Sequence, residues 1–101
     1  MDLLDGETRA ALPPLRSTER LGRDALAGAK FFTPDANWTW YATEFDGDDL
    51  FFGLVSGFEL EYGYFSLREL ESIQGGLALP VERDLHYHPE PLHVIEARHR
   101  R

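Results

Sequence analysis

The chain has 101 residues, about the length of one domain, and 43% of them are hydrophobic, which excludes a disordered polypeptide. It contains no Cys, so disulfides, thiolate zinc sites and Cys nucleophiles are excluded. It has no apolar run long enough to cross a membrane, and its acidic start, MDLLDGETR, is not typical of a signal peptide. We therefore expect a cytoplasmic protein with residues 1–101 in a single domain.

The formal net charge of −8 comes from the middle of the chain. Acids and bases balance in residues 1–34 and again in residues 72–101, whereas residues 35–71 hold nine acids and one base, Arg68. Binding to a DNA or RNA backbone requires clustered Lys and Arg, so we expect no direct nucleic-acid contact. Solubility alone would explain a net charge of this size, but it does not require such segregation.

Residues 1–26 are expected to form a helical N-terminal segment. Its two short helices lie around Gly6–Leu12 and Ser17–Leu21, and Pro13 and Pro14 separate them because Pro ends helices.

Residues 29–73 are expected to form a β-meander followed by a capped helix. Asp46 and Gly47 predict a tight hairpin, and the apolar strand after it is expected to be covered on both faces. In the strand before the hairpin, alternation places Trp38, Trp40, Ala42 and Glu44 on one face and Thr39, Tyr41, Thr43 and Phe45 on the other. The expected strands are Ala29–Thr33, Trp38–Phe45, Leu50–Gly57 and Glu59–Phe65.

The helix is expected to begin after Ser66, which with Glu69 fits a capping box. It should run to about Ile73, with Leu67, Leu70 and Ile73 facing inward, and end at residues 74–76. In residues 80–101 we expect a strand near Leu85–His88 and a basic tail. The predicted fold class is α+β, a small antiparallel β-meander of three to four strands with short helices packed on one face.

Three blocks of the sequence, NWTWY, FFGLV and GYFSL with ELES, carry a family resemblance. With KFFTP upstream and GLALPVERDLHYHPEPL downstream, residues 12–92 resemble the bacterial family catalogued as domain of unknown function 2958. The resemblance implies a shared fold and a setting on plasmids, prophages and other mobile elements. The family has no assigned reaction, so no catalytic residue is carried over. The chain departs from the family at His86 and His88, where the resemblance implies aromatic or acidic residues.

Several residues could support chemistry, each with a plainer interpretation beside it. His86 and His88 could hold a metal ion if Glu90 or His93 joined them, or they could be surface residues beside a Pro turn. Glu44, Glu59 and Glu61 could act as paired carboxylates, or they could form a solvated strand face. No serine lies in a nucleophile motif and no nucleotide-binding motif is present, so we expect no cofactor.

The acidic middle segment suggests a binding surface. Carboxylates on a strand and a hairpin tip can approach the charge density of a nucleic-acid backbone, which would attract them to a basic groove. Aromatic residues could add apolar anchors, or they could serve only sheet packing. The expected contacts are Glu44, Asp46, Asp48, Asp49, Glu59, Glu61, Glu71, Trp38, Trp40 and Tyr62.

The hypothesis is a non-enzymatic protein from a mobile element, monomeric or homodimeric, that inhibits a nucleic-acid-binding defence complex of the host by mimicry. An anti-CRISPR protein is its most specific form. One alternative is a metal-dependent or hydrolytic accessory enzyme that uses His86, His88 and nearby carboxylates. The other is a self-associating accessory module.

Overall fold

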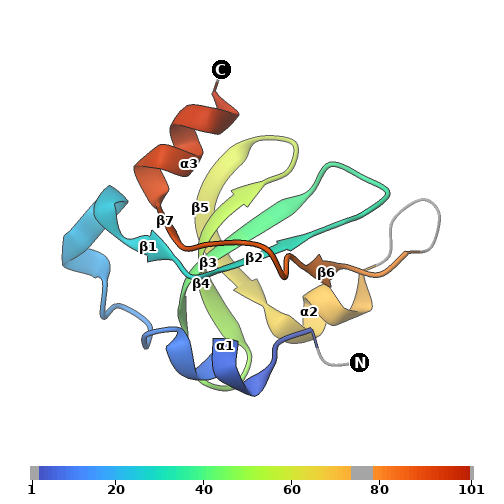
Figure 1. The fold of residues 1–101 in the computed structure, drawn as a ribbon, viewed down its shortest axis with the longest axis horizontal. Coiled ribbons are helices and arrows are strands. Elements are labelled where there is room, and N and C mark those ends of the chain that lie inside the picture. The colour runs from blue at the N-terminus through green and yellow to red at the C-terminus, as the bar shows by residue number, and fades with distance from the viewer. Residues whose placement is uncertain (1–2, 74–78, 101) are drawn as a thin grey trace.

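The protein is built on a five-stranded antiparallel sheet with the strand order β5-β4-β3-β2-β6, and a separate two-stranded pair, β1-β7, accompanies it (Figure 1). The computed structural model describes residues 3–73 and 79–100. The strands are β1 (Leu26–Ala27), β2 (Ala29–Phe32), β3 (Thr39–Phe45), β4 (Leu50–Ser56), β5 (Leu60–Ser66), β6 (Glu82–Arg83) and β7 (Glu90–Pro91). The helices are α1 (Gly6–Ala11), the 3₁₀-helix η1 (Glu19–Asp24), α2 (Leu67–Ser72) and α3 (Leu92–His99).

The predicted α+β meander is confirmed, and it gains a strand from the C-terminal segment. Strands β2 to β5 are consecutive antiparallel neighbours, and β6 pairs with the outer edge of β2 through Phe31↔Arg83 and Phe32↔Glu82. The meander from β2 to β5 thus has four strands, within the expected three to four, and β6 makes the described sheet five-stranded. The helix after Ser66 is also confirmed, because the Ser66 hydroxyl accepts a hydrogen bond from the Glu69 N–H. The expected end of this helix at residues 74–76 lies outside the described residues.

The predicted alternation of β3 fails at its C-terminal end. Ala42 pairs with Gly53, but Glu44 pairs with Phe52, so Thr43 is an extra residue in the strand. Such a β-bulge reverses the faces of the residues that follow it. Phe45 therefore joins the core face of Trp40 and Ala42, and the expectation that Glu44 shares their face is wrong.

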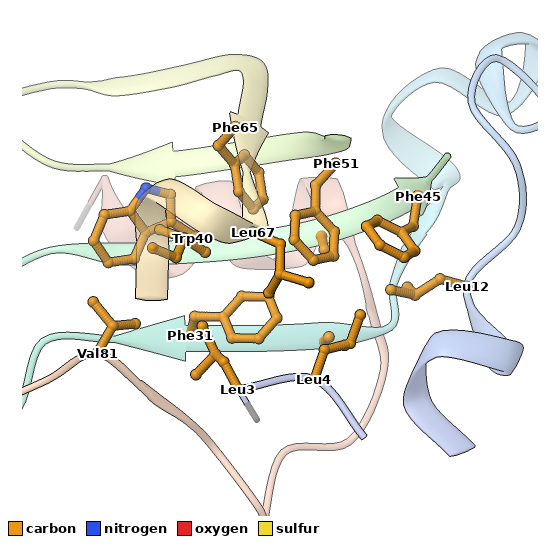
Figure 2. Packing of buried hydrophobic residues seen from close by; sticks show 13 residues of the cluster. Leu3, Leu4, Leu12, Phe31, Trp40, Phe45, Phe51, Phe65, Leu67 and Val81 are labelled. Carbon is orange, nitrogen blue, oxygen red and sulfur yellow. The ribbon is translucent and has the colours of Figure 1, made fainter. Parts of the chain in front are cut away.

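Aromatic rings fill the core on that face of the sheet. The Phe51 ring lies 4.5 Å from Phe45, 5.1 Å from Phe65 and 5.4 Å from Phe31 between centroids, and the first two pairs are stacked. Figure 2 shows these rings from four strands together with Leu67 of α2. Offset ring pairs add to the stabilisation that burial gives. The N-terminal residues Leu3, Leu4 and Leu12 close the same cluster.

The opposite face of the sheet is covered by α3, which the sequence analysis did not predict. Leu92 and Ile95 of α3 pack with Tyr41 of β3 and Leu54 of β4. The expected strand near Leu85–His88 is wrong, because residues 85–86 form a turn. The basic residues expected as a tail begin in the last turn of α3, at Arg98 and His99. Helices cover both faces of the sheet, not one.

The N-terminal helices also differ in part from expectation. The first helix is confirmed at Gly6–Ala11, with the Asp5 carboxylate capping it by accepting from the Thr8 N–H. The second is a 3₁₀-helix at Glu19–Asp24, later than expected, and Gly22 interrupts it with a positive φ of 53°.

Gly53→Ala tests how closely β3 and β4 approach. A Cβ at Gly53 would lie 1.8 Å from the Tyr41 carbonyl oxygen, so the strands would have to separate. We expect a loss of about 3 kcal/mol in the free energy of unfolding, measured in urea. The matched control is Gly63→Ala, where a Cβ meets nothing within 4 Å. Equal stability of the two variants would contradict the packing described here.

Candidate functional site

The acids of the middle segment do not form one continuous surface. Asp46, Asp48 and Asp49 lie at the β3–β4 hairpin, whereas Glu59 and Glu61 lie at the β4–β5 turn and the start of β5. These two turns are at opposite ends of β4, which has seven residues and therefore spans roughly 20 Å. The expected acidic surface is thus two separate groups.

The hairpin acids hold the local fold. Asp46 Oδ1 accepts hydrogen bonds from the N–H groups of Asp48, Asp49 and Leu50 at 2.8, 2.8 and 3.0 Å. These backbone donors lower the pKa of Asp46 and keep its carboxylate ionised. Gly47 supplies the positive φ of 90° that this turn needs.

Asp49 connects the hairpin to helix α2. Its carboxylate accepts from the Ser66 hydroxyl at 2.7 Å and from the Arg68 N–H at 2.8 Å, and these bonds lower its pKa. The Arg68 guanidinium lies 3.2 Å from an Asp48 oxygen and 3.6 Å from an Asp49 oxygen. The single base of the middle segment thus offsets the charge of this acidic group.

Glu44 is buried, with 4% of its surface exposed, and cannot serve as the surface contact that was expected. Its carboxylate accepts hydrogen bonds from the Arg16 N–H at 2.8 Å, the Thr18 N–H at 2.9 Å and the Thr18 hydroxyl. Burial alone would raise its pKa, but the Thr18 and Arg16 donors outweigh burial and lower it. Glu44 therefore anchors residues 16–18 to the end of β3. A small cavity of about 200 Å³ lies beside it.

The other end of β4 presents an aromatic side chain to solvent. Phe58, in the β4–β5 turn, is 95% exposed, and its ring meets the partly buried Trp38 ring edge-on at 5.3 Å. Trp38 stacks at 5.9 Å on Trp40, which is buried in the core and so is not an exposed anchor as expected. A Cβ at Gly57 would lie 2.3 Å from the Trp38 ring, so only Gly permits this packing.

Glu59 and Glu61 follow Phe58 in the chain and are exposed. Neither carboxylate forms an ion pair with any residue in the ranges 3–73 and 79–100. We call Trp38, Phe58, Glu59 and Glu61 the β4–β5 tip. Of the other expected contacts, Glu71 is exposed on α2 and accepts from the Leu3 N–H at 3.4 Å, and Tyr62 is 42% exposed on β5.

The residues proposed for metal chemistry do not come together. His86 and His88 are exposed and lie in the segment between β6 and β7, not on a strand. The described part of the chain holds no group of three or more His, Asp or Glu side chains arranged to hold a metal ion.

One cluster that the sequence analysis missed joins α3 to the sheet. The hydroxyl of buried Tyr41 lies 2.8 Å from His99 Nε2, and Ser56 Oγ lies 3.4 Å from His99 Nδ1. Burial raises the pKa of Tyr41, so its hydroxyl is neutral and can either donate to the ring or accept from it. The tautomer of His99 sets the direction of both hydrogen bonds. The three residues link α3 to β3 and β4.

A shallow groove of about 620 Å³ lies next to this cluster. Phe32, Thr39 and Ser56 are neighbours across β2, β3 and β4, and Lys30, Asp84 and His99 also line the groove. Lys30 Nζ lies 3.6 Å from Asp84 Oδ2, so the groove carries both charges. No local motif marks these residues, because four separate segments contribute them.

The family comparison matches a model described as protein of unknown function (DUF2958) over residues 3–97. The chain belongs to this family. The match includes every helix and strand that the structure describes, apart from the C-terminal two residues of α3. No curated protein and no solved structure matches the chain. None of the described helices is long and apolar enough to span a membrane.

Replacing Glu44 tests its role as an anchor. We expect Glu44→Gln to lower the free energy of unfolding by about 2 kcal/mol at neutral pH, because a charged acceptor of three hydrogen bonds is lost. The folded-state pKa of Glu44 is lowered, so its contribution is present above 4.5 and is lost as the pH falls through the folded pKa. The difference between the two proteins in urea unfolding should shrink in acid. The exposed Glu61→Gln should change stability by less than about 0.5 kcal/mol, and an equal loss there would contradict this role.

Replacing His99 tests the link to Tyr41. Burial and then the charges of Arg98 and Lys30 lower the pKa of His99 from 6.5. The unfolded chain therefore takes up the proton more readily, and stability falls as the pH drops below 6.5. We expect His99→Gln to cost about 1 kcal/mol at neutral pH and to weaken the decline between about pH 7 and about pH 5.5. His88→Gln is the control, and an unchanged decline in His99→Gln would contradict this assignment.

Proposed function

We propose that this protein is a non-enzymatic interaction protein whose β4–β5 tip binds a basic, nucleic-acid-binding protein complex. The observation that carries the proposal is Phe58, a large apolar side chain that is 95% exposed and is supported by Trp38. Leaving such a ring in water is unfavourable, and a partner pocket that covered it would recover the hydrophobic free energy. Buried aromatic anchors of this kind dominate the binding energy of many interfaces.

The charges beside Phe58 suggest the chemistry of the partner. Glu59 and Glu61 are exposed and have no basic partner in the described part of the chain. Residues two apart on a strand are separated by about 7 Å, which is about twice the 3.4 Å rise per phosphate in a DNA strand. A groove that binds nucleic acid presents Lys and Arg at matching intervals. Such a groove would attract these carboxylates and speed association at low salt.

The support of the ring by Trp38 and Gly57 also favours binding. Trp38 packs on Trp40 and against the Gly57 backbone, so the base of the turn is held by the core. An anchor that is already ordered loses less conformational entropy when it binds. The most specific form of the proposal is an anti-CRISPR-like inhibitor that blocks a host defence complex by mimicry. The resemblance to proteins of plasmids and prophages supports that form by analogy alone.

Two variants separate the apolar and the charged contributions. In a tagged pull-down from a bacterial lysate that carries defence systems, we expect the wild type to retain a nucleic-acid-binding complex at low salt. High salt or added duplex DNA or RNA should release it. Phe58→Ala and Glu59→Lys/Glu61→Lys should each weaken retention at least about tenfold, the loss expected from one good anchor or two charge contacts.

The charge-matched control is Glu19→Lys/Glu82→Lys, which reverses two exposed acids on η1 and β6. It should bind like the wild type, and all variants should unfold cooperatively in urea. Full retention by both tip variants at low salt would contradict the proposal. If the retained partner is not displaced by nucleic acid, the mimicry part of the proposal is contradicted and only binding at the tip is supported.

A further inference from the structure

The outer edge of β5 is open to a further strand. β5 has seven residues and pairs with β4 over its whole length, from Leu50↔Ser66 to Ser56↔Leu60, without a register shift. Among residues 3–73 and 79–100, β4 is its only strand partner. An edge of this length presents a row of unpaired N–H and C=O groups on which another strand can pair. The other edge of the sheet, β6, has two residues and follows Pro80 closely.

The sequence of β5 lacks the features that usually block pairing at an edge. Leu60–Ser66 contains no Pro and no Lys, and its continuous register excludes a β-bulge against β4. Tyr62 and Tyr64 point to the same face of the sheet and are 42% and 56% exposed. Gly63, between them, has nothing within 4 Å of the position of a Cβ. Among the described residues the outer edge of β5 has no strand partner, the face at Gly63 has room for a side chain, and Tyr62 and Tyr64 make the opposite face partly apolar.

We propose that a second copy of this chain pairs with this edge, β5 against β5, in an antiparallel two-fold arrangement centred on Gly63. In that register Tyr62 lies opposite Tyr64 of the second copy, so the symmetry forms two cross-strand aromatic pairs. Glu61 lies opposite Phe65, so the only carboxylate within the strand does not face its own copy. The register therefore sets no two carboxylates of the strand opposite each other, and the same residues of both copies form the contact, as in a two-fold interface.

The paired strands join two five-stranded sheets into one continuous sheet. Because the strands are antiparallel, Phe58 of each copy lies beside the end of β5 that leads into α2 in the other copy. The two β4–β5 tips therefore lie at opposite ends of the interface, each beside the start of α2 of the other copy. This dimer does not depend on the proposed function. If both hold, the dimer presents two binding tips, which raises the avidity for a complex with repeated basic grooves.

A higher salt concentration should strengthen the dimer and weaken the binding of the tip to its partner. Each copy carries a net charge of −8, so two copies repel each other and screening favours the dimer. Binding of the acidic tip to a basic partner weakens with salt for the same reason. We expect sedimentation equilibrium to show a monomer–dimer equilibrium whose dissociation constant falls as the salt concentration rises.

Two double variants test whether the side chains of β5 determine dimerisation. The Tyr62→Lys/Tyr64→Lys variant places two Lys residues on the edge strand, and Lys on an edge disfavours pairing with another strand. We expect it to weaken dimerisation at least about tenfold, although it reduces the net repulsion between copies. The matched control, Leu85→Lys/Val94→Lys, adds the same charge at two exposed apolar residues of the β6–β7 segment and α3, and should dimerise at least as well as the wild type. A wild type that stays monomeric at both low and high salt concentration overturns the proposal. So does a Tyr double variant that dimerises like the control.

Cross-linking tests the register. Residues directly opposite in antiparallel strands have Cα atoms about 4.5 or 5.5 Å apart, which suits a disulfide, and the chain has no Cys of its own. Gly63→Cys should give a disulfide-linked dimer on mild oxidation, and Leu85→Cys in the exposed turn should not. Equal cross-linking of both overturns the register. If the wild type is monomeric and the Tyr62→Lys/Tyr64→Lys variant no longer retains the partner, the β5 edge binds the partner and the dimer is overturned. If the tip variants retain the partner fully, only the proposed function is contradicted.

Discussion

The extra residue in β3 is the constraint on which the rest of the structure depends. Thr43 interrupts the pairing with β4, and its hydroxyl donates to the Phe52 carbonyl at 3.0 Å. As a result Phe45 enters the aromatic core and Glu44 turns to the opposite face. Both residues then bind the N-terminal segment: the Phe45 N–H donates to the Pro13 carbonyl, and Glu44 accepts from Arg16 and Thr18. Without the bulge, a carboxylate would occupy the core and the N-terminal segment would lose its contacts with Glu44 and Phe45.

Much of the meander could be predicted because short-range chemistry determines it. Asp46 and Gly47 favour a tight turn through one side-chain acceptor and one positive φ, and Ser66 caps a helix through one hydroxyl. These interactions involve neighbours in sequence. The bulge could not be predicted, because strict alternation has no signal for an inserted residue. Helix α3 was missed for a related reason: Leu92 and Ile95 are its only buried apolar residues, which is too few to indicate a helical period.

The candidate site was predictable only in part. The sequence showed that acids gather in residues 35–71, but it could not show which of them serve as hydrogen-bond acceptors inside the fold. Asp46, Asp49 and Glu44 accept hydrogen bonds from backbone N–H groups, which stabilise their carboxylates, and Arg68 adds to this at Asp49. That use of carboxylates explains how acids can crowd beside apolar strands. Within the described residues Glu59 and Glu61 have no such donors. Phe58, which the sequence did not single out, precedes them in the chain and packs against Trp38.

The contacts of Arg83 have a consequence for the order of assembly during synthesis. Its guanidinium donates to the Leu3 carbonyl at 3.2 Å, the Thr8 hydroxyl at 3.4 Å and the Asp5 carboxylate at 3.0 Å. The strands β2 to β5 are complete in the emerging chain before Arg83 leaves the ribosome, and domains begin to form as their segments emerge. The contacts of Arg83 with residues 3–8 can therefore form only after β6 has emerged. A nascent chain halted between β5 and β6 would hold its meander and the contacts of Glu44 and Phe45 with residues 13–18, but it would lack the Arg83 contacts with residues 3–8.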